Sequence, residues 1–160
     1  MRIIVLSDTH MPRSAQDFPP AVYAEIEKSD MIIHAGDFVE IEVLKKLQAL
    51  KPTKAVCGNM DSQAIRNELN TKELLQFGKI RVGLIHGYGP PAGLVDTVAS
   101  EFSGVDAIVF GHTHSAINDL KGGVLFFNPG SPTDTVFAKV NSFGILEIDD
   151  NGIKGKIIKI

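Results

Sequence analysis

Short apolar runs recur along the chain, and each one ends in a cluster of polar residues and glycine. Five such runs lie in the first 110 residues, at positions 3–6, 31–33, 54–57, 82–85 and 107–110. Runs of this length that are rich in β-branched residues are typical of strands buried on both faces. The pattern therefore predicts five buried strands, each with polar side chains just past its end.

Helical patterns separate these runs. Pro19 and Pro20 precede Val22 and Ile26, and proline suits the first turn of a helix. Apolar residues also recur at helical spacing over residues 41–50 and 94–102. The alternation of strand and helix predicts the α/β fold class, with helices layered on a sheet.

The last third of the chain has a different pattern. Turn signals at Gly122-Gly123, Asn141-Ser142 and Asn151-Gly152 separate short strand-like runs. We expect antiparallel strands at residues 124–127, 135–140, 143–148 and 153–160. These strands would form a second, hairpin-rich sheet, so that two sheets pack face to face with helices outside. The whole of residues 1–160 is expected to form one domain, because this length can bury a sizeable core.

Composition limits which partners the protein can bind and which cellular compartment suits it. The formal net charge is −3, and Lys and Arg are scattered, which argues against a general nucleic-acid binding patch. Cys57 is the one cysteine, so no internal disulfide can form and a reducing compartment is favoured. The apolar run at residues 3–6 is too short for a signal peptide or a membrane span. We expect a cytoplasmic protein with no membrane partner.

Seven side chains that can bind metal follow the five predicted strands: Asp8, His10, Asp37, Asn59, His86, His112 and His114. Sites in open α/β sheets form at the carboxyl ends of strands, so one edge could gather them all. Two pairs lie two residues apart, and on extended backbone such residues face the same way. Glycine directly precedes Asp37, Asn59 and His112, where it permits a sharp bend or a close backbone approach.

Imidazole, carboxylate and amide groups suit divalent manganese, iron, cobalt, nickel or zinc. Two ions about 3.5–4 Å apart could share one carboxylate, hold a hydroxide and clamp a phosphoryl group for in-line attack. Any one of the seven residues alone would be better explained by a structural role. His34 lies within a predicted strand, and we expect it to support the structure rather than bind metal.

A dinucleotide-binding module is the first alternative. Residues 87–92 fit the loose G-x-G-x-x-A pattern between a predicted strand and a helix. However, Pro90 and Pro91 remove two backbone N–H groups where a pyrophosphate would need donors. This reading is therefore disfavoured.

The polar clusters resemble the five motifs of the calcineurin-like metallophosphoesterases. The matching segments are Asp8-Thr9-His10, Gly36-Asp37, Gly58-Asn59, His86-Gly87 and Gly111-His112-Thr113-His114. The chain is most similar in length to the small bacterial and archaeal phosphodiesterase branch, to which the retromer scaffold subunit is related. Asn128-Pro129-Gly130-Ser131 further resembles a loop of that branch.

This resemblance implies a four-layer α-β-β-α sandwich of two mixed sheets flanked by helices. It also implies two metal ions per chain, with manganese expected first and nickel, cobalt, iron or zinc as alternatives. One ion would take Asp8, His10, Asp37 and His114. The other would take Asp37, Asn59, His86 and His112, with Asp37 bridging.

The implied function is hydrolysis of a small phosphodiester by a metal-bound hydroxide. Asp37, Asn59 and His86 are the expected catalytic residues, and Asn59 and Arg13 are expected to contact the substrate phosphate. A phosphomonoesterase and a non-catalytic interaction scaffold of the same fold remain alternatives, and a homo-oligomer stays open.

Two positions depart from the family pattern. Met60 and Tyr88 stand where larger or related members often carry histidine, so the group that protonates the leaving group is unassigned. Asp61 is expected to cap the helix that follows it, and otherwise to support the site. Arg13, three residues after His10, could hold a phosphate or be a solvated surface residue.

Overall fold

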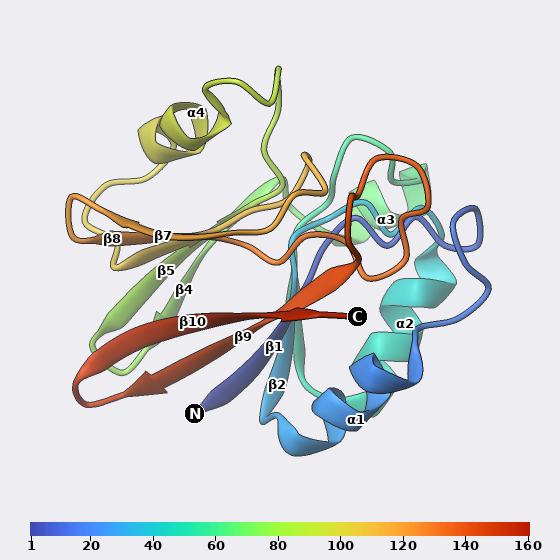
Figure 1. Ribbon diagram of the computed structural model, residues 1–160, viewed down its shortest axis with the longest axis horizontal. Coiled ribbons are helices and arrows are strands. Elements are labelled where there is room, and N and C mark those ends of the chain that lie inside the picture. Colours follow the sequence, from blue (N-terminus) through green and yellow to red (C-terminus); the bar gives the residue numbers. More distant parts are fainter.

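The computed structural model describes residues 1–160, which form two five-stranded sheets and four helices (Figure 1). The first sheet has the strand order β10-β9-β1-β2-β3. Its strands are β1 (Arg2–Leu6), β2 (Met31–His34), β3 (Thr53–Ala55), β9 (Ser142–Asp149) and β10 (Gly152–Lys159). Strands β1, β2 and β3 are parallel, whereas β9 and β10 form an antiparallel hairpin that pairs with β1.

The second sheet has the strand order β4-β5-β6-β8-β7. Its strands are β4 (Lys72–Phe77), β5 (Ile80–Ile85), β6 (Ala107–Val109), β7 (Ile117–Lys121) and β8 (Val124–Asn128). The three central strands β5, β6 and β8 are parallel, and an antiparallel strand lies at each edge. Each sheet therefore carries three parallel strands whose carboxyl ends lie at one edge.

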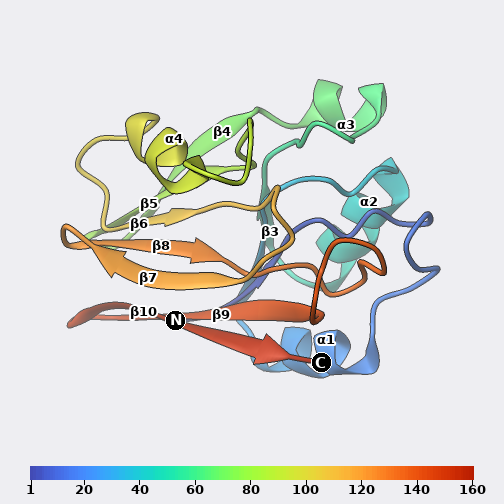
Figure 2. The ribbon, with the colours of Figure 1, turned by 45° about the horizontal axis from the view of Figure 1, so that its top comes forward.

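Alternation along the strands divides the core into layers. Ile3 and Val5 of β1 belong to a cluster packed between the two sheets, whereas Ile4 and Leu6 belong to a cluster under helices α1 (Pro20–Lys28), α2 (Ile41–Leu50) and α3 (Gln63–Glu68). A third cluster lies between the second sheet and α4 (Leu94–Ser100). Figure 2 shows α4 and α1 on opposite outer faces of the stacked sheets. This arrangement is the predicted α-β-β-α sandwich.

The expectation of a separate sheet from the last third of the chain was wrong. Strand β8 joins the second sheet, whereas β9 and β10 join the first. Residues 135–140 form no strand, because the Asp134 carboxylate accepts the backbone N–H groups of residues 136, 137 and 138. Those donors are thus unavailable for a sheet ladder.

The sequence pattern also missed the two edge strands of the second sheet. Half of the residues of β4 and most of those of β7 are polar, and both strands are largely exposed, so they lack the continuous apolar run of a central strand. The short helix α3 was missed as well. None of the four helices is long and apolar enough to cross a membrane.

Candidate metal centre

The carboxyl ends of both parallel sets meet at one end of the sandwich. All seven predicted site residues lie in the segments that directly follow β1, β2, β3, β5 and β6: Asp8, His10, Asp37, Asn59, His86, His112 and His114. Residues from the two ends of this series come into contact, because His10 Nε2 lies 3.2 Å from His114 Nε2. The structure therefore brings the predicted set together from two sheets.

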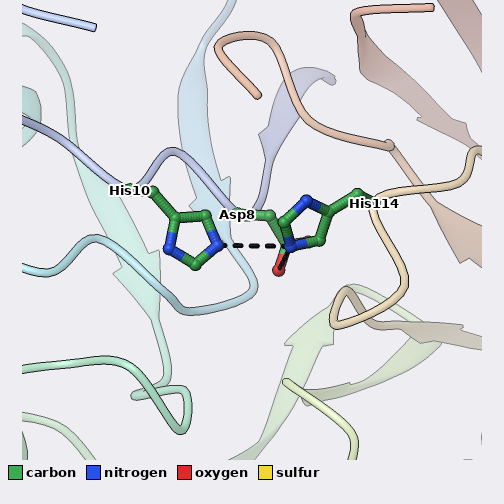
Figure 3. Close-up of side chains that lie close together, drawn as sticks. All are labelled: Asp8, His10 and His114. Atoms are coloured by element: carbon green, nitrogen blue, oxygen red, sulfur yellow. Dashed lines mark hydrogen bonds and ion pairs between the residues drawn. The ribbon is translucent and has the colours of Figure 1, made fainter. Parts of the chain in front are cut away.

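One group of donors is centred on Asp8. Figure 3 shows His10 and His114 facing each other beside the Asp8 carboxylate. His114 Nε2 lies 3.5 Å from Asp8 Oδ1, and His10 Nε2 lies 3.6 Å from Asp37 Oδ2. Asp8 is fully buried and pairs with no Lys or Arg, so its only possible cationic partners are the nearby rings of His86 and His114. This arrangement offers two nitrogens and the Asp8 carboxylate to one point, with Asp37 beside His10.

A second group is centred on Asp37 and Asn59. His86 Nε2 lies 3.3 Å from Asp37 Oδ2 and 3.1 Å from Asn59 Oδ1. His112 Nδ1 lies 3.2 Å from the same Asn59 oxygen. Asp37 Oδ2 thus lies near His10 of the first group and His86 of the second. This is the position that a bridging carboxylate requires.

Three imidazole rings are held by oxygen acceptors outside the cluster. His86 Nδ1 donates to the Ala35 carbonyl at 2.7 Å, and His114 Nδ1 donates to Asp134 Oδ2 at 2.6 Å. His112 Nε2 donates to the Gly89 carbonyl at 2.9 Å. When the ring is neutral, each bond fixes the proton on the outer nitrogen, so the inner nitrogen presents a lone pair to the cluster. This donor set fits divalent ions of intermediate hardness.

The ionisable groups perturb one another strongly. Burial raises the pKa of Asp8 and lowers the pKa of His10. Burial opposes protonation of His86, but the hydrogen bond with Asp37 and the charges of both aspartates raise its pKa to about 9. For Asp37, burial again acts in the opposite direction, and the contact with His86 lowers its pKa. In the metal-free protein, a proton on His86 therefore partly neutralises the carboxylates, which a bound metal cation would otherwise do.

Backbone conformation at the cluster is unusual. Five of the seven side chains are carried by residues with positive φ: Asp8, His10, Asp37, His112 and His114. Left-handed backbone costs a residue other than glycine about 1–3 kcal/mol, and such positions cluster at functional sites. At Gly58 and Gly111, glycine is needed for space. A Cβ on Gly58 would overlap the Asp37 carboxylate, and a Cβ on Gly111 would overlap Ser7. A Cβ on Gly36, whose φ is +95°, would lie 2.8 Å from the Gly58 backbone nitrogen, so all three predicted glycine positions have a close approach.

Asp61 does not cap the helix that follows it, contrary to the prediction. Ser62 holds the N-cap position of α3, and the Asp61 carboxylate accepts backbone N–H groups of Asp37, Val39 and Gly58 at 2.7–3.0 Å. Arg66 of α3 donates to the backbone carbonyls of Asn59 and Asp61. These bonds hold the loops that carry Asp37 and Asn59, so Asp61 supports the site.

Asp134 is a functional candidate that the sequence reasoning missed. Besides the His114 ring, its carboxylate accepts three backbone N–H groups, and together these bonds outweigh burial and lower its pKa to about 2. The preceding loop also supports the site, because Ser131 and Thr133 donate to the backbone carbonyls of Asp8 and Thr9. An acidic residue shortly after the Asn-Pro-Gly-Ser segment was the available signal.

The remaining predicted positions lie as follows. His34 is fully buried, stacks on Phe38 with ring centroids 3.6 Å apart, and lies outside the cluster, as expected. Arg13 is exposed and lines the cavity over the cluster, which has a volume of about 480 Å³. Met60 lines the same cavity, whereas Tyr88 donates its hydroxyl to Glu101.

Comparison with known proteins agrees with this fold. The family model of the calcineurin-like phosphoesterase superfamily domain matches residues 1–151. The chain therefore belongs to the calcineurin-like phosphoesterase superfamily. Divalent metal ions are implied by this family.

Three relatives illustrate the range of similarity. The protein named probable metallophosphoesterase MJ0623 of Methanocaldococcus jannaschii is 37% identical over 163 residues, covering 100% of this chain and 82% of its own length. Phosphodiesterase MJ0936 of the same organism is 26% identical over 147 residues, covering 81% and 83%. The crystal structure of Vps29 from Entamoeba histolytica complexed with zinc is 25% identical, covers 99% of both chains, and has a TM-score of 0.75.

Proposed function

We propose that this protein is a dinuclear metal-dependent phosphodiesterase, with residues 1–160 acting as one catalytic domain. The observation that carries the proposal is the convergence of seven donor side chains from both sheets, three with their outer ring nitrogens already bonded. A relative that is named a phosphodiesterase and a similarly folded protein that binds zinc support it.

Each side chain has a role in this proposal. Asp8, His10, Asp37 and His114 would hold one ion, and Asp37, Asn59, His86 and His112 the other. Two divalent ions would activate a water molecule and neutralise phosphate charge. Manganese is the expected ion, with nickel, cobalt, iron or zinc as alternatives.

Substrate binding would use groups at the cavity. The Asn59 amide can donate to a phosphate oxygen, and Arg13 at the rim can pair with the phosphate charge. Met60 has no proton to donate, and Tyr88 is turned to Glu101. The proposal therefore favours diesters whose leaving group departs without protonation.

The test is metal removal and restoration on matched esters. Chelation should abolish cleavage of bis(p-nitrophenyl) phosphate, and manganese, cobalt or nickel should restore it together with two ions per chain. Magnesium should restore it poorly, because it prefers oxygen ligands and retains its waters. p-Nitrophenyl phosphate should be cleaved more slowly than the diester.

Each contrary outcome has a distinct meaning. Full activity in protein shown to be free of metal would reject the dinuclear mechanism. Two bound ions without cleavage of any ester would favour a scaffold, and faster cleavage of the monoester would favour a phosphomonoesterase. The complete donor set argues for catalysis, since a scaffold has no need to orient seven donors toward one point.

A further inference from the structure

Two large apolar side chains are exposed at the rim of the metal centre. Val136 is 75% exposed and Phe137 is 72% exposed, although nothing in the packing of the sheets requires apolar residues there. Both line the cavity of about 480 Å³ that also contains His10, Asp37 and His114. Apolar groups left in water beside a binding site are candidates for contact with a ligand.

The position of these side chains is fixed by hydrogen bonds. Asp134 Oδ1 accepts the N–H of Val136 at 2.9 Å, and Oδ2 accepts the N–H of Phe137 at 2.8 Å. The same Oδ2 accepts the ring N–H of His114. The Phe137 ring contacts the His114 ring at a right angle, with centroids 5.5 Å apart. One carboxylate thus places both the apolar rim and a predicted metal ligand.

The cavity is lined by both polar and apolar side chains. The predicted ligands and Arg13 form the polar part, and Val136, Phe137, Met60 and Pro91 form the apolar part. Met60 is itself 44% exposed, so the apolar surface continues across the cavity. An occupant that carries a phosphate at one end and a flat apolar group at the other matches both parts.

We propose that Val136 and Phe137 form a subsite for an aromatic ring or nucleobase attached to the phosphodiester. The proposal rests on the proposed function and specifies its substrate class: diesters in which one alcohol is an aryl or nucleoside group. An aromatic ring on Phe137 gains stacking and removes apolar surface from water, whereas a small alkyl group gains little.

Two esters with the same leaving group isolate this contact. Thymidine 5′-(p-nitrophenyl phosphate) and methyl p-nitrophenyl phosphate both release p-nitrophenolate, so their kcat/KM ratio reports the retained group. Phe137→Ala should lower this ratio about tenfold, as expected for loss of one stacking contact. Phe137→Trp should retain it. Leu120→Ala, which removes an equally exposed apolar side chain on β7, should leave the ratio unchanged. A ratio unaffected by Phe137→Ala would overturn the proposal.

Equilibrium binding separates this proposal from the proposed function. Phenylphosphonate should bind the manganese-loaded wild type about tenfold more tightly than methylphosphonate, and Phe137→Ala should remove the difference. If the wild type cleaves neither ester, the proposed function fails. The two phosphonates would still show whether the aromatic subsite exists. Equal affinities, or no binding of either phosphonate, would overturn it and leave the exposed rim to a different ligand.

Discussion

The two sheets contribute different chemistry to the same site. The segments after β1, β2 and β3 supply both carboxylates, the amide and one imidazole, whereas the segments after β5 and β6 supply three imidazoles. Both clusters with metal-binding geometry combine residues of the two sheets. Neither sheet alone could hold an ion in this way, so the site exists only where the sheets are packed together.

The two sheets also hold their donors differently. Asp37 of the first sheet is fixed by loop backbone groups: its own N–H donates to Asp61, and its Oδ1 accepts the N–H of Met60. His86 and His114 of the second sheet are fixed through their outer ring nitrogens. This difference indicates that first-sheet donors depend on loop conformation, whereas second-sheet donors depend on single acceptor oxygens.

The largest effect is expected for Asp37→Asn. Asp37 lies between donors of both sheets, so the neutral amide should weaken both ions together and lower kcat/KM on the order of 10³-fold, since metal-ion charge stabilisation is worth several kcal/mol. Metal content by mass spectrometry and kinetics on bis(p-nitrophenyl) phosphate measure this.

His34→Ala is the contrasting variant. It should lose about 2–4 kcal/mol of unfolding free energy, because the ring is fully buried against Phe38, while both ions remain. If His34→Ala loses an ion and Asp37→Asn keeps two, the assignment of ligands is wrong.

The contact between His86 and Asp37 predicts a pH effect in the metal-free protein. The folded pKa of His86, about 9, exceeds the ordinary value of 6.5, so its contribution to stability is fully present below pH 6.5 and is lost as pH rises through about 9. The difference between these two pKa values corresponds to a loss of about 3 kcal/mol of unfolding free energy. Urea unfolding in chelator between pH 6.5 and 9.5 measures the loss.

His86→Gln is the control for this pH effect, and it should flatten the dependence. Metal binding should show the opposite trend, because it requires the neutral ring and strengthens as pH rises. A metal-free wild type whose stability is constant over this range would show that the two sheets are not coupled through this pair.

Asp134→Asn tests the acceptor that orients a second-sheet donor. A carboxylate accepts with two oxygens, whereas an amide has only one, so the substituted side chain cannot accept from the His114 ring and from all the loop N–H groups. Affinity for one ion should therefore fall about 10–100-fold. Calorimetric manganese titration should show one weakened and one retained site. Asp96→Asn, an exposed aspartate paired with Lys121, is the matched control. Equal weakening by both variants would assign the effect to net charge.

The smallest effect is expected for Met60→His. This position follows Asn59 and lines the cavity, so an imidazole there could protonate a leaving group. We expect a gain of about tenfold or less for alkyl diesters, at the low end of general-acid effects, and little change for aryl diesters. A plot of log kcat/KM against leaving-group pKa measures it. If the wild type already gives a flat plot, protonation is provided elsewhere and Met60 is not a missing acid.

Much of the architecture could be predicted from the sequence, for physical reasons visible in particular elements. Strands β1, β2, β5 and β6 are buried on both faces, so their apolar runs are continuous. The donors follow those strands directly, which is why the candidate set could be predicted. Edge strands β4 and β7 lack that signal.

Side-chain hydrogen bonds account for the other misses. Asp61 accepts N–H groups of residues 22 and 24 positions away, and Asp134 accepts from a ring 20 positions away. No local pattern encodes such a partner, so a helix cap was predicted for Asp61. The strand predicted for residues 135–140 is instead prevented by local bonds, in which Asp134 accepts the N–H groups of residues 136, 137 and 138. Each of the two segments is held by its own buried carboxylate, Asp61 or Asp134, which accepts several backbone N–H groups.

The left-handed backbone at five donor positions has a consequence for how such a chain changes over generations. At about 1–3 kcal/mol each, the strain is comparable to the net stability of a small domain. A descendant released from the need for ions would gain stability by exchanging these residues for glycine. Aspartate and histidine at these positions thus mark a lineage in which selection for the site has outweighed selection for a more stable fold.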